Sequence, residues 1–287
     1  MASEDNSEYF ESWRRKRTAL YEALSEGGSD ERPLNREAVL ASRELFVVDP
    51  MDSERVVPRL FDLLSVEDAV TVVVAEIPTE MAEILHQAAL EVLQALESSA
   101  EPSPATYVSD KDIMHMTLFY TSHPDDLSTQ PKLERIPQEL ALLRELATQF
   151  EPFDVVPVKV TLAASGAVLL LFECESDGSL QDSASTVNAG RAAEFSVDLI
   201  RHQARQTFPF VSNKGPSAII HTTLARVLTP DVSPEALSKA RAKCTELSRR
   251  FAAHKQSCRI SRLWYVDESH FIAPRGQTTV IELGGSQ

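Results

Sequence analysis

The first 68 residues alternate between helical stripes and polar breaks. Apolar residues within 9–24 recur at helical spacing around the basic run 14–17, which predicts an amphipathic helix. Such a basic run is typical of a solvated helix face. Residues 34–46 and 56–64 predict two further helical pieces. We therefore interpret residues 1–68 as a helical extension.

From residue 69 onward, β-branched runs alternate with amphipathic stretches. The pattern predicts strands at 69–75, 113–120, 155–160, 167–173, 216–227, 260–267 and 278–283, and helices at 80–96, 140–150, 192–207 and 234–254. A segment rich in Ser, Asp and Gly at 174–190 predicts a surface connection. The element order indicates an α+β domain at 69–287, with two similar lobes at about 69–175 and 190–287.

Cysteine content and hydropathy restrict the compartment. Cys174, Cys244 and Cys258 form no C-x-x-C pair and cannot all pair in disulfides, which favours a reducing compartment. The longest apolar run, 160–172, is short of the roughly 20 residues that cross a bilayer. The N-terminal residues lack the basic start and following apolar stretch of a secretory signal, so we expect none. We expect a cytoplasmic protein, with the nucleus as the alternative, and no membrane association.

Two histidines stand in matching contexts, one in each half of the chain. The sequences around His115 and His221 read Ile-Met-His-Met-Thr-Leu and Ile-Ile-His-Thr-Thr-Leu. Side chains two apart share one face of a strand, so His115 projects with Thr117 and His221 with Thr223. One H-x-T match is weak, but the matched context in both halves is a strong signal. The other five histidines have no such partner and are interpreted as structural.

This pair of motifs resembles the signature of the 2H phosphoesterase superfamily, which includes bacterial 2′-5′ RNA ligase-like proteins and plant and fungal cyclic phosphodiesterases. The signature is two H-h-[ST]-h motifs, where h is hydrophobic. Thr222 departs from it by occupying a hydrophobic slot, whereas Arg226 completes an H-x-T-L-x-R run similar to that of ligase-like members. The resemblance covers about 69–285 and implies two pseudo-symmetric lobes with mainly antiparallel sheets facing a central groove. Residues 1–68 have no counterpart in it.

The resemblance implies a metal-independent phosphoric diester hydrolase that opens a 2′,3′-cyclic phosphate of a nucleotide or RNA end. His115 and His221 would act as general base and acid, because histidine titrates near neutral pH and two histidines in complementary protonation states divide the proton transfers. Such a pair predicts a bell-shaped pH profile. Thr117 and Thr223 would donate hydrogen bonds to phosphate oxygens. No cofactor and no metal are expected.

Two cations are candidates for offsetting the charge on phosphate. Arg226 points away from Thr223 in an ideal strand, so a surface ion pair is the rival interpretation. Lys214 lies in a Ser-Asn-Lys-Gly-Pro loop, which would either close over substrate or leave the ammonium solvated. Four aromatic residues either stack on a base or belong to the core: Phe119, Tyr120, Phe208 and Phe210.

The distribution of charge favours a small anionic ligand. With 43 acidic and 28 basic residues the net charge is −15, which argues against binding long double-stranded nucleic acid. The net charge is −7 over 1–68, −14 over 69–182 and +6 over 183–287, the segment that contains His221. We expect a monomer that binds a small nucleotide or a short RNA end, and a protein partner for residues 1–68 is left open.

Three other interpretations stay open. A zinc site formed by His115, His221 and a carboxylate has no ligand spacing in its favour. A nucleotide- or RNA-binding or protein-interaction module on the same fold would bind without turnover, although phosphate binding needs donors and not two groups that titrate near neutrality. A 3′-end RNA exonuclease would need a longer basic groove.

Overall fold

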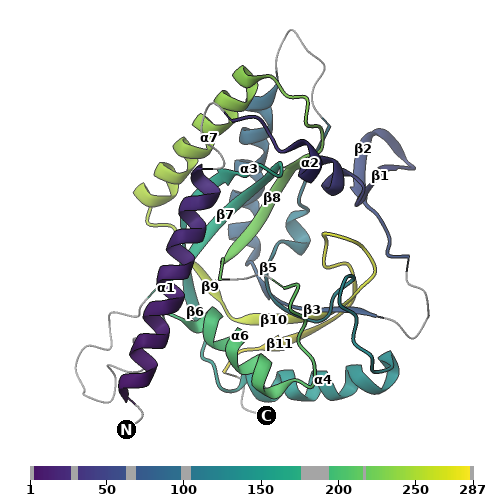
Figure 1. The fold of residues 1–287 in the computed structure, drawn as a ribbon, viewed down its shortest axis with the longest axis vertical. Helices are drawn as coiled ribbons and strands as arrows, with labels where there is room; N and C mark the ends of the chain where they lie inside the picture. The colour runs from purple at the N-terminus through teal and green to yellow at the C-terminus, as the bar shows by residue number, and fades with distance from the viewer. Residues whose placement is uncertain are drawn as a thin grey trace.

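The computed structural model describes residues 3–26, 32–62, 69–97, 105–175, 194–215 and 218–284. Its strands form a four-stranded sheet in the order β11-β10-β3-β5, a five-stranded sheet in the order β4-β8-β7-β6-β9, and the separate hairpin β1-β2 (Figure 1). All pairings in these sheets are antiparallel. The predicted α+β class is confirmed.

The elements have the following bounds. The strands are β1 (Phe46–Asp49), β2 (Asp52–Pro58), β3 (Val70–Glu76), β4 (Thr106–Val108), β5 (His115–Ser122), β6 (Phe153–Leu162), β7 (Ala167–Cys174), β8 (His221–Val227), β9 (Cys258–Ile260), β10 (Arg262–Glu268) and β11 (Gly276–Glu282). The helices are α1 (Ser3–Glu26), α2 (Arg36–Arg43), α3 (Thr79–Leu96), η1 (Lys111–Ile113), α4 (Lys132–Ala147), α6 (Ser196–Thr207) and α7 (Pro234–Ala253). None of the helices in the described ranges is both long and apolar enough to cross a membrane.

The N-terminal segment departs from the predicted helical extension. Residues 56–58 belong to β2, which pairs with β1 around a turn where the Met51 N–H donates to Asp49. Adjacent β-branched valines in both strands favour this hairpin over a helix, so the helix predicted at 56–64 is wrong as far as the described residues reach. The predicted helix at 9–24 is confirmed within α1, which lies across β7 in Figure 1.

The two sheets do not coincide with the predicted lobes. β3 and β5 come from the first half of the chain, yet their sheet is completed by β10 and β11 from its end. The hairpin β6-β7, also in the first half, joins β8 and β9. The sheets therefore do not follow the predicted lobes at about 69–175 and 190–287, because strand pairing over long sequence separations overrides the order along the chain, and the lobe division itself stays a prediction. The predicted connection at 174–190 lies, from residue 176 on, outside the described residues.

Each sheet buries one face in a common core. Helices α3 and α7 pack together, and both contribute to the same hydrophobic cluster as the two sheets. The other face, which we call the second face, carries a smaller cluster in each sheet. These clusters are Val72, Val74 and Val266 in the four-stranded sheet, and Ala167, Leu169 and Leu171 in the five-stranded sheet. Tyr21 and Leu24 of α1 cover the latter cluster, so α1 occupies part of the second face.

The turn between β6 and β7 requires glycine. Gly166 has φ +82°, and its oxygen accepts a 2.8 Å hydrogen bond from the Val227 N–H at the end of β8. A Cβ at Gly166 would lie 2.4 Å from the Val227 oxygen. We expect Gly166→Ala to lower the free energy of unfolding by roughly 2 kcal/mol or more, measured by urea titration. Gly215→Ala is the control, because the nearest atom to its Cβ is 3.8 Å away, and equal stability losses would contradict this explanation.

Candidate active site

Both histidines of the matched motifs begin a strand. His115 is the first residue of β5 in the four-stranded sheet, and His221 is the first residue of β8 in the five-stranded sheet. The strands meet at these ends, because the Thr222 hydroxyl donates a 2.7 Å hydrogen bond to the main-chain oxygen of His115. Thr222, the departure from the 2H signature, is buried and links the two motifs.

The first motif contains a β-bulge at its leucine. Thr117 and Phe119 lie opposite adjacent residues of β3, so Leu118 is the extra residue of β5. An extra residue reverses the alternation of side chains beyond it. Tyr120 therefore shares the second face with Thr117 and His115 instead of pointing to the opposite side.

The second motif contains the same bulge. Thr223 and Ala225 lie opposite adjacent residues of β7, so Leu224 is the extra residue of β8. The alternation again reverses, and Arg226 joins His221 and Thr223 on the second face. The prediction for an ideal strand, that Arg226 points away from Thr223, is therefore wrong, and the bulge is the reason.

His115 is held by its own backbone. Its Nδ1 lies 3.0 Å from the oxygen of Ile113, which accepts the Nδ1–H and leaves Nε2 as the nitrogen with a free lone pair. Burial lowers the pKa of His115 to about 4, against the smaller opposite effect of this hydrogen bond. The imidazole is therefore neutral at pH 7 and can accept a proton at Nε2.

His221 lies among positive charges. Burial lowers its pKa to about 4, and Arg201, His115 and Arg226 lower it in addition. Its buried Nδ1 has no hydrogen-bond partner in the described part of the protein. Both histidines are thus neutral at pH 7 in the free protein, and the complementary protonation states expected from the sequence require an added negative charge.

The threonines of the two motifs have unused hydroxyl groups. Thr117 and Thr223 are half-buried on the second face. Neither hydroxyl has a hydrogen-bond partner among residues 3–26, 32–62, 69–97, 105–175, 194–215 and 218–284. Each can therefore donate to a ligand bound beside its histidine.

Arg226 carries a buried charge without a carboxylate. Burial lowers its pKa, and its Nε is buried without a hydrogen-bond partner in the described structure. Within the described residues its guanidinium makes one hydrogen bond, from Nη1 to the Ser42 hydroxyl of α2 at 3.4 Å, and no ion pair with a carboxylate. The rival interpretation as a surface ion pair is wrong. An uncompensated guanidinium beside His221 is suited to an anion.

Lys214 lies apart from Arg226. Its loop is fixed to the edge of β5, where the Ser212 N–H donates to the Tyr120 oxygen at 2.9 Å, and its ammonium is close enough to His123 to lower the pKa of that histidine. In the part of the chain that the structure describes, it makes no hydrogen bond or ion pair with His115 or His221. The structure therefore assigns Lys214 to the neighbourhood of Tyr120.

The aromatic candidates divide into two groups. Phe119 and Phe208 are buried and pack edge to face at 5.2 Å, as the core interpretation predicts. Phe210 is half-buried. Tyr120 is half-buried on the second face, where its ring meets His123 at 4.9 Å. Of the four, Tyr120 is the one that the bulge brings to the same face as His115.

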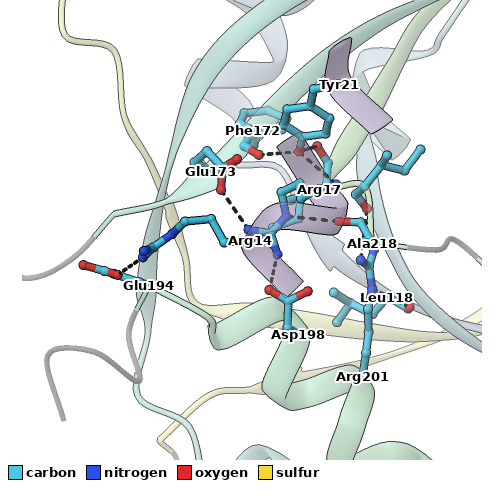
Figure 2. A network of polar contacts seen from close by, with 12 residues as sticks. Arg14, Arg17, Tyr21, Leu118, Phe172, Glu173, Glu194, Asp198, Arg201 and Ala218 are labelled. Atoms are coloured by element: carbon cyan, nitrogen blue, oxygen red, sulfur yellow. Dashed lines mark hydrogen bonds and ion pairs between the residues drawn. The ribbon is translucent and has the colours of Figure 1, made fainter. Parts of the chain in front are cut away.

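The sequence did not indicate a network of polar side chains that binds the backbone beside the motifs; Figure 2 shows Arg17, Tyr21 and Arg201 in this network. Arg201 of α6 donates to main-chain oxygens beside both histidines, and Arg17 and Tyr21 of α1 bind the backbone just before His221. In the basic run at 14–17, Arg15 and Lys16 are exposed, as the interpretation as a solvated helix face predicts. Arg17 is buried, so this interpretation is wrong for Arg17. No local pattern distinguishes Arg17 from its basic neighbours, because its partners are remote in sequence.

The zinc alternative finds no third ligand in the described part of the chain. No group of three or more His, Cys, Asp or Glu side chains lies together there in a way that would hold a metal ion. The three cysteines are buried and unpaired.

A cleft of about 760 Å³ lies along the outer edge of β4. Its lining includes Tyr107, three cations and three aspartates, but neither histidine of the two motifs: the charged residues are Arg55, Lys111, Arg275, Asp49, Asp52 and Asp110. Tyr107 is paired with Arg226 between β4 and β8. The cleft therefore adjoins the second motif on the side of Arg226.

Several solved structures have folds similar to that of this chain. No family model matches the sequence, and no curated protein matches it significantly. E. coli LigT complexed with 3′-AMP is similar over 76% of this chain and 96% of its own, at 17% identity and a TM-score of 0.36. Kluyveromyces marxianus Usb1 is similar over 76% and 100%, at 13% identity and a TM-score of 0.43. LigT and Usb1 are 2H phosphoesterase superfamily members.

A further similar structure is ATU0111 of Agrobacterium tumefaciens, a conserved protein of unknown function, over 80% of this chain and 95% of its own, at 12% identity and a TM-score of 0.47. All three TM-scores are below 0.5. The likeness to LigT and Usb1 is therefore no evidence for an activity of this protein. Such evidence has to come from its own side chains.

Proposed function

We propose that this protein is a metal-independent phosphoesterase of the 2H type that opens a 2′,3′-cyclic phosphodiester of a nucleotide or an RNA end. The observation that supports it most is that the two strands meet at their histidine ends. His115 and Thr117 share one face there, and His221 and Thr223 share another, to which the bulge at Leu224 adds Arg226. Phosphate binding alone would need the hydroxyl and guanidinium donors but not two imidazoles.

The reaction follows from these groups. One neutral histidine takes a proton from water, whose oxygen attacks phosphorus. The bond from phosphorus to the 2′ or 3′ oxygen breaks, and the other histidine, in its protonated form, gives its proton to that departing oxygen. The product is a phosphomonoester. Thr117 and Thr223 donate to the non-bridging oxygens, and Arg226 offsets the charge that develops on them.

The cleft along β4 suits the remainder of the substrate. Its volume of about 760 Å³ is in the range of small-ligand sites, and it adjoins Arg226 through Tyr107. A phosphate held by Arg226 would leave the attached nucleoside within reach of this cleft. The proposed substrate is thus a nucleotide or a short RNA end.

Purified protein should be incubated, with EDTA present, with 2′,3′-cyclic nucleotides, with oligonucleotides ending in a 2′,3′-cyclic phosphate, and with oligonucleotides ending in a 3′-hydroxyl. The proposal predicts opening of the cyclic phosphates, with no shortening of the chains. Stepwise loss of 3′ nucleotides would favour the exonuclease, and binding of all ligands without turnover would favour the binding module. Either outcome contradicts the proposal.

The pH dependence follows from the lowered pKa values of the histidines. The reaction needs one protonated and one neutral imidazole, and both have a pKa of about 4 in the free protein. Above about pH 5 the fraction of protein molecules with one protonated and one neutral histidine falls about tenfold per pH unit. Because kcat/KM reports the protonation state of the free enzyme, kcat/KM should fall by the same factor. A bound phosphodiester raises both pKa values, so kcat should peak at a higher pH. Identical pH profiles of kcat and kcat/KM would contradict this.

A further inference from the structure

Arg201 of α6 binds the backbone of both histidine motifs. Its Nη2 and Nε donate to the oxygens of Thr117 and Leu118 at 2.8 and 3.0 Å, and its Nη1 donates to the oxygen of Ile219 at 3.0 Å. The side chain is 7% exposed. One planar guanidinium therefore fixes the distance between the bulge of β5 and the residues that lead into β8.

The backbone before His221 is held at three consecutive residues (Figure 2). The oxygen of Ala218 accepts from Arg17 at 3.0 Å, the oxygen of Ile219 accepts from Arg201, and the N–H of Ile220 donates to the Tyr21 hydroxyl at 3.1 Å. Two of these bonds come from α1 and one from α6. The position of His221 therefore depends on the N-terminal helix as well as on its own sheet.

The helices that supply these bonds are joined to each other. Arg17, which is 1% exposed, forms an ion pair with Asp198 of α6 and another, at 2.8 Å, with Glu173 of β7. Tyr21 also donates to the oxygen of Phe172 at 2.6 Å. Buried ion pairs cost desolvation, which is offset only where the geometry is well defined. The set is thus a fixed connection between α1, α6 and the start of β8.

We propose that Arg201 is a positioning residue that sets the placement of His115 relative to His221, and that α1 completes this arrangement through Arg17 and Tyr21. The proposal deepens the function proposed above and rests on it where turnover is concerned. It assigns to the N-terminal segment, which has no counterpart in the 2H signature, a part in building the site.

The charge of Arg201 has a second consequence. Burial lowers the pKa of Arg201 to about 10, so the guanidinium is still charged at neutral pH, and this charge lowers the pKa of His221. Among the described residues, His115 on β5 and Arg226 on β8 also lower the pKa of His221, and the phenol of Tyr21 on α1 bonds the preceding residue, Ile220. Glu173 on β7 is engaged by Arg17. Removing the charge of Arg201 should therefore raise the pKa of His221, while burial and Arg226 continue to lower it.

Two substitutions separate the geometry from the charge. Arg201→Lys keeps a positive charge but loses the fork that reaches three oxygens, whereas Arg201→Met loses both. The NMR titration of the His221 ring should give a pKa close to wild type in Arg201→Lys and a higher pKa in Arg201→Met. His254 and His270, which lie outside this cluster, serve as internal references. This measurement does not require turnover.

With a substrate, Arg201→Lys should lower kcat by about 10- to 100-fold and change KM by less than about threefold, because catalytic groups are misplaced while the phosphate donors remain. Tyr21→Phe, which removes the hydroxyl that bonds the backbone of Phe172 and Ile220, should also lower kcat, by a smaller factor. It also keeps the proposal testable if the Arg201 variants do not fold.

Arg135→Lys is the matched control. Arg135 is an equally buried arginine that donates to the oxygens of Ala69 and Thr121, away from the motifs. It should lose thermal stability without shifting the His221 titration or kcat. An unshifted His221 titration in Arg201→Met, or an equal loss of kcat in Arg135→Lys, would overturn the positioning role. Absence of turnover in wild type with the predicted titration shifts would instead count against the proposed function alone.

Discussion

Replacing either His115 or His221 with alanine should lower kcat on a 2′,3′-cyclic nucleotide by about 10²- to 10⁴-fold, while the protein stays folded. Each substitution removes one of the two proton transfers, and no other histidine among the described residues shares the matched motif. Because the two groups act as a unit, the double variant should be scarcely slower than the slower single variant. Initial rates at saturating substrate measure all three.

His254→Ala is the control for these substitutions, because His254 is exposed at the end of α7. Its rate should equal that of wild type. If the losses in the two single variants multiplied in the double variant, the histidines would act in separate steps and the paired role would be wrong. If either single variant kept the wild-type rate, that histidine would not be catalytic.

Arg226→Gln should affect activity and stability in opposite directions. Arg226 is half-buried, its Nε is buried without a hydrogen-bond partner, and no carboxylate of the described structure pairs with it, so we expect its charge to cost stability in the free protein and to be available to the phosphate. We expect kcat/KM to fall by about 10²- to 10³-fold, as for the loss of one donor to a developing charge. The free energy of unfolding, measured in urea, should be unchanged or higher than that of wild type.

Arg259→Gln is the matched control for Arg226. Arg259 is exposed on β9 of the same sheet and is paired with Asp154 at 2.6 Å. Its replacement should change stability by less than about 1 kcal/mol and leave kcat/KM unaltered. A large loss of stability in Arg226→Gln with normal kcat/KM would show that this arginine is structural.

The positions of the candidate site residues follow from the sequence more directly than the fold around them does. The two motifs are local patterns, so His115, Thr117, His221 and Thr223 are found without a structure. The alternation rule fails at Arg226, because no residue type marks the bulge at Leu224 and the register comes from pairing with β7. The register is a property of two paired strands and cannot be predicted from the sequence of either strand alone.

The remaining differences are long-range. Each strand of the hairpin β1-β2 contains two adjacent valines. So short an apolar run in the sequence is compatible with either a helix or a strand. Arg201 and Tyr21 lie in ordinary helical patterns, and their partners at Thr117 and Ile220 are separated from them by most of a domain in sequence. Contacts of this kind depend on how the sheets are completed, which the order of elements does not determine.

The central claim is that the two histidines form one site that opens a cyclic phosphodiester without a metal. The most direct test follows the conversion of a 2′,3′-cyclic nucleotide by ³¹P NMR, with EDTA present, for wild type and for the His115→Ala, His221→Ala double variant at equal concentration. We predict conversion to a single phosphomonoester by wild type and none above background by the double variant. Equal conversion by both proteins would contradict the claim.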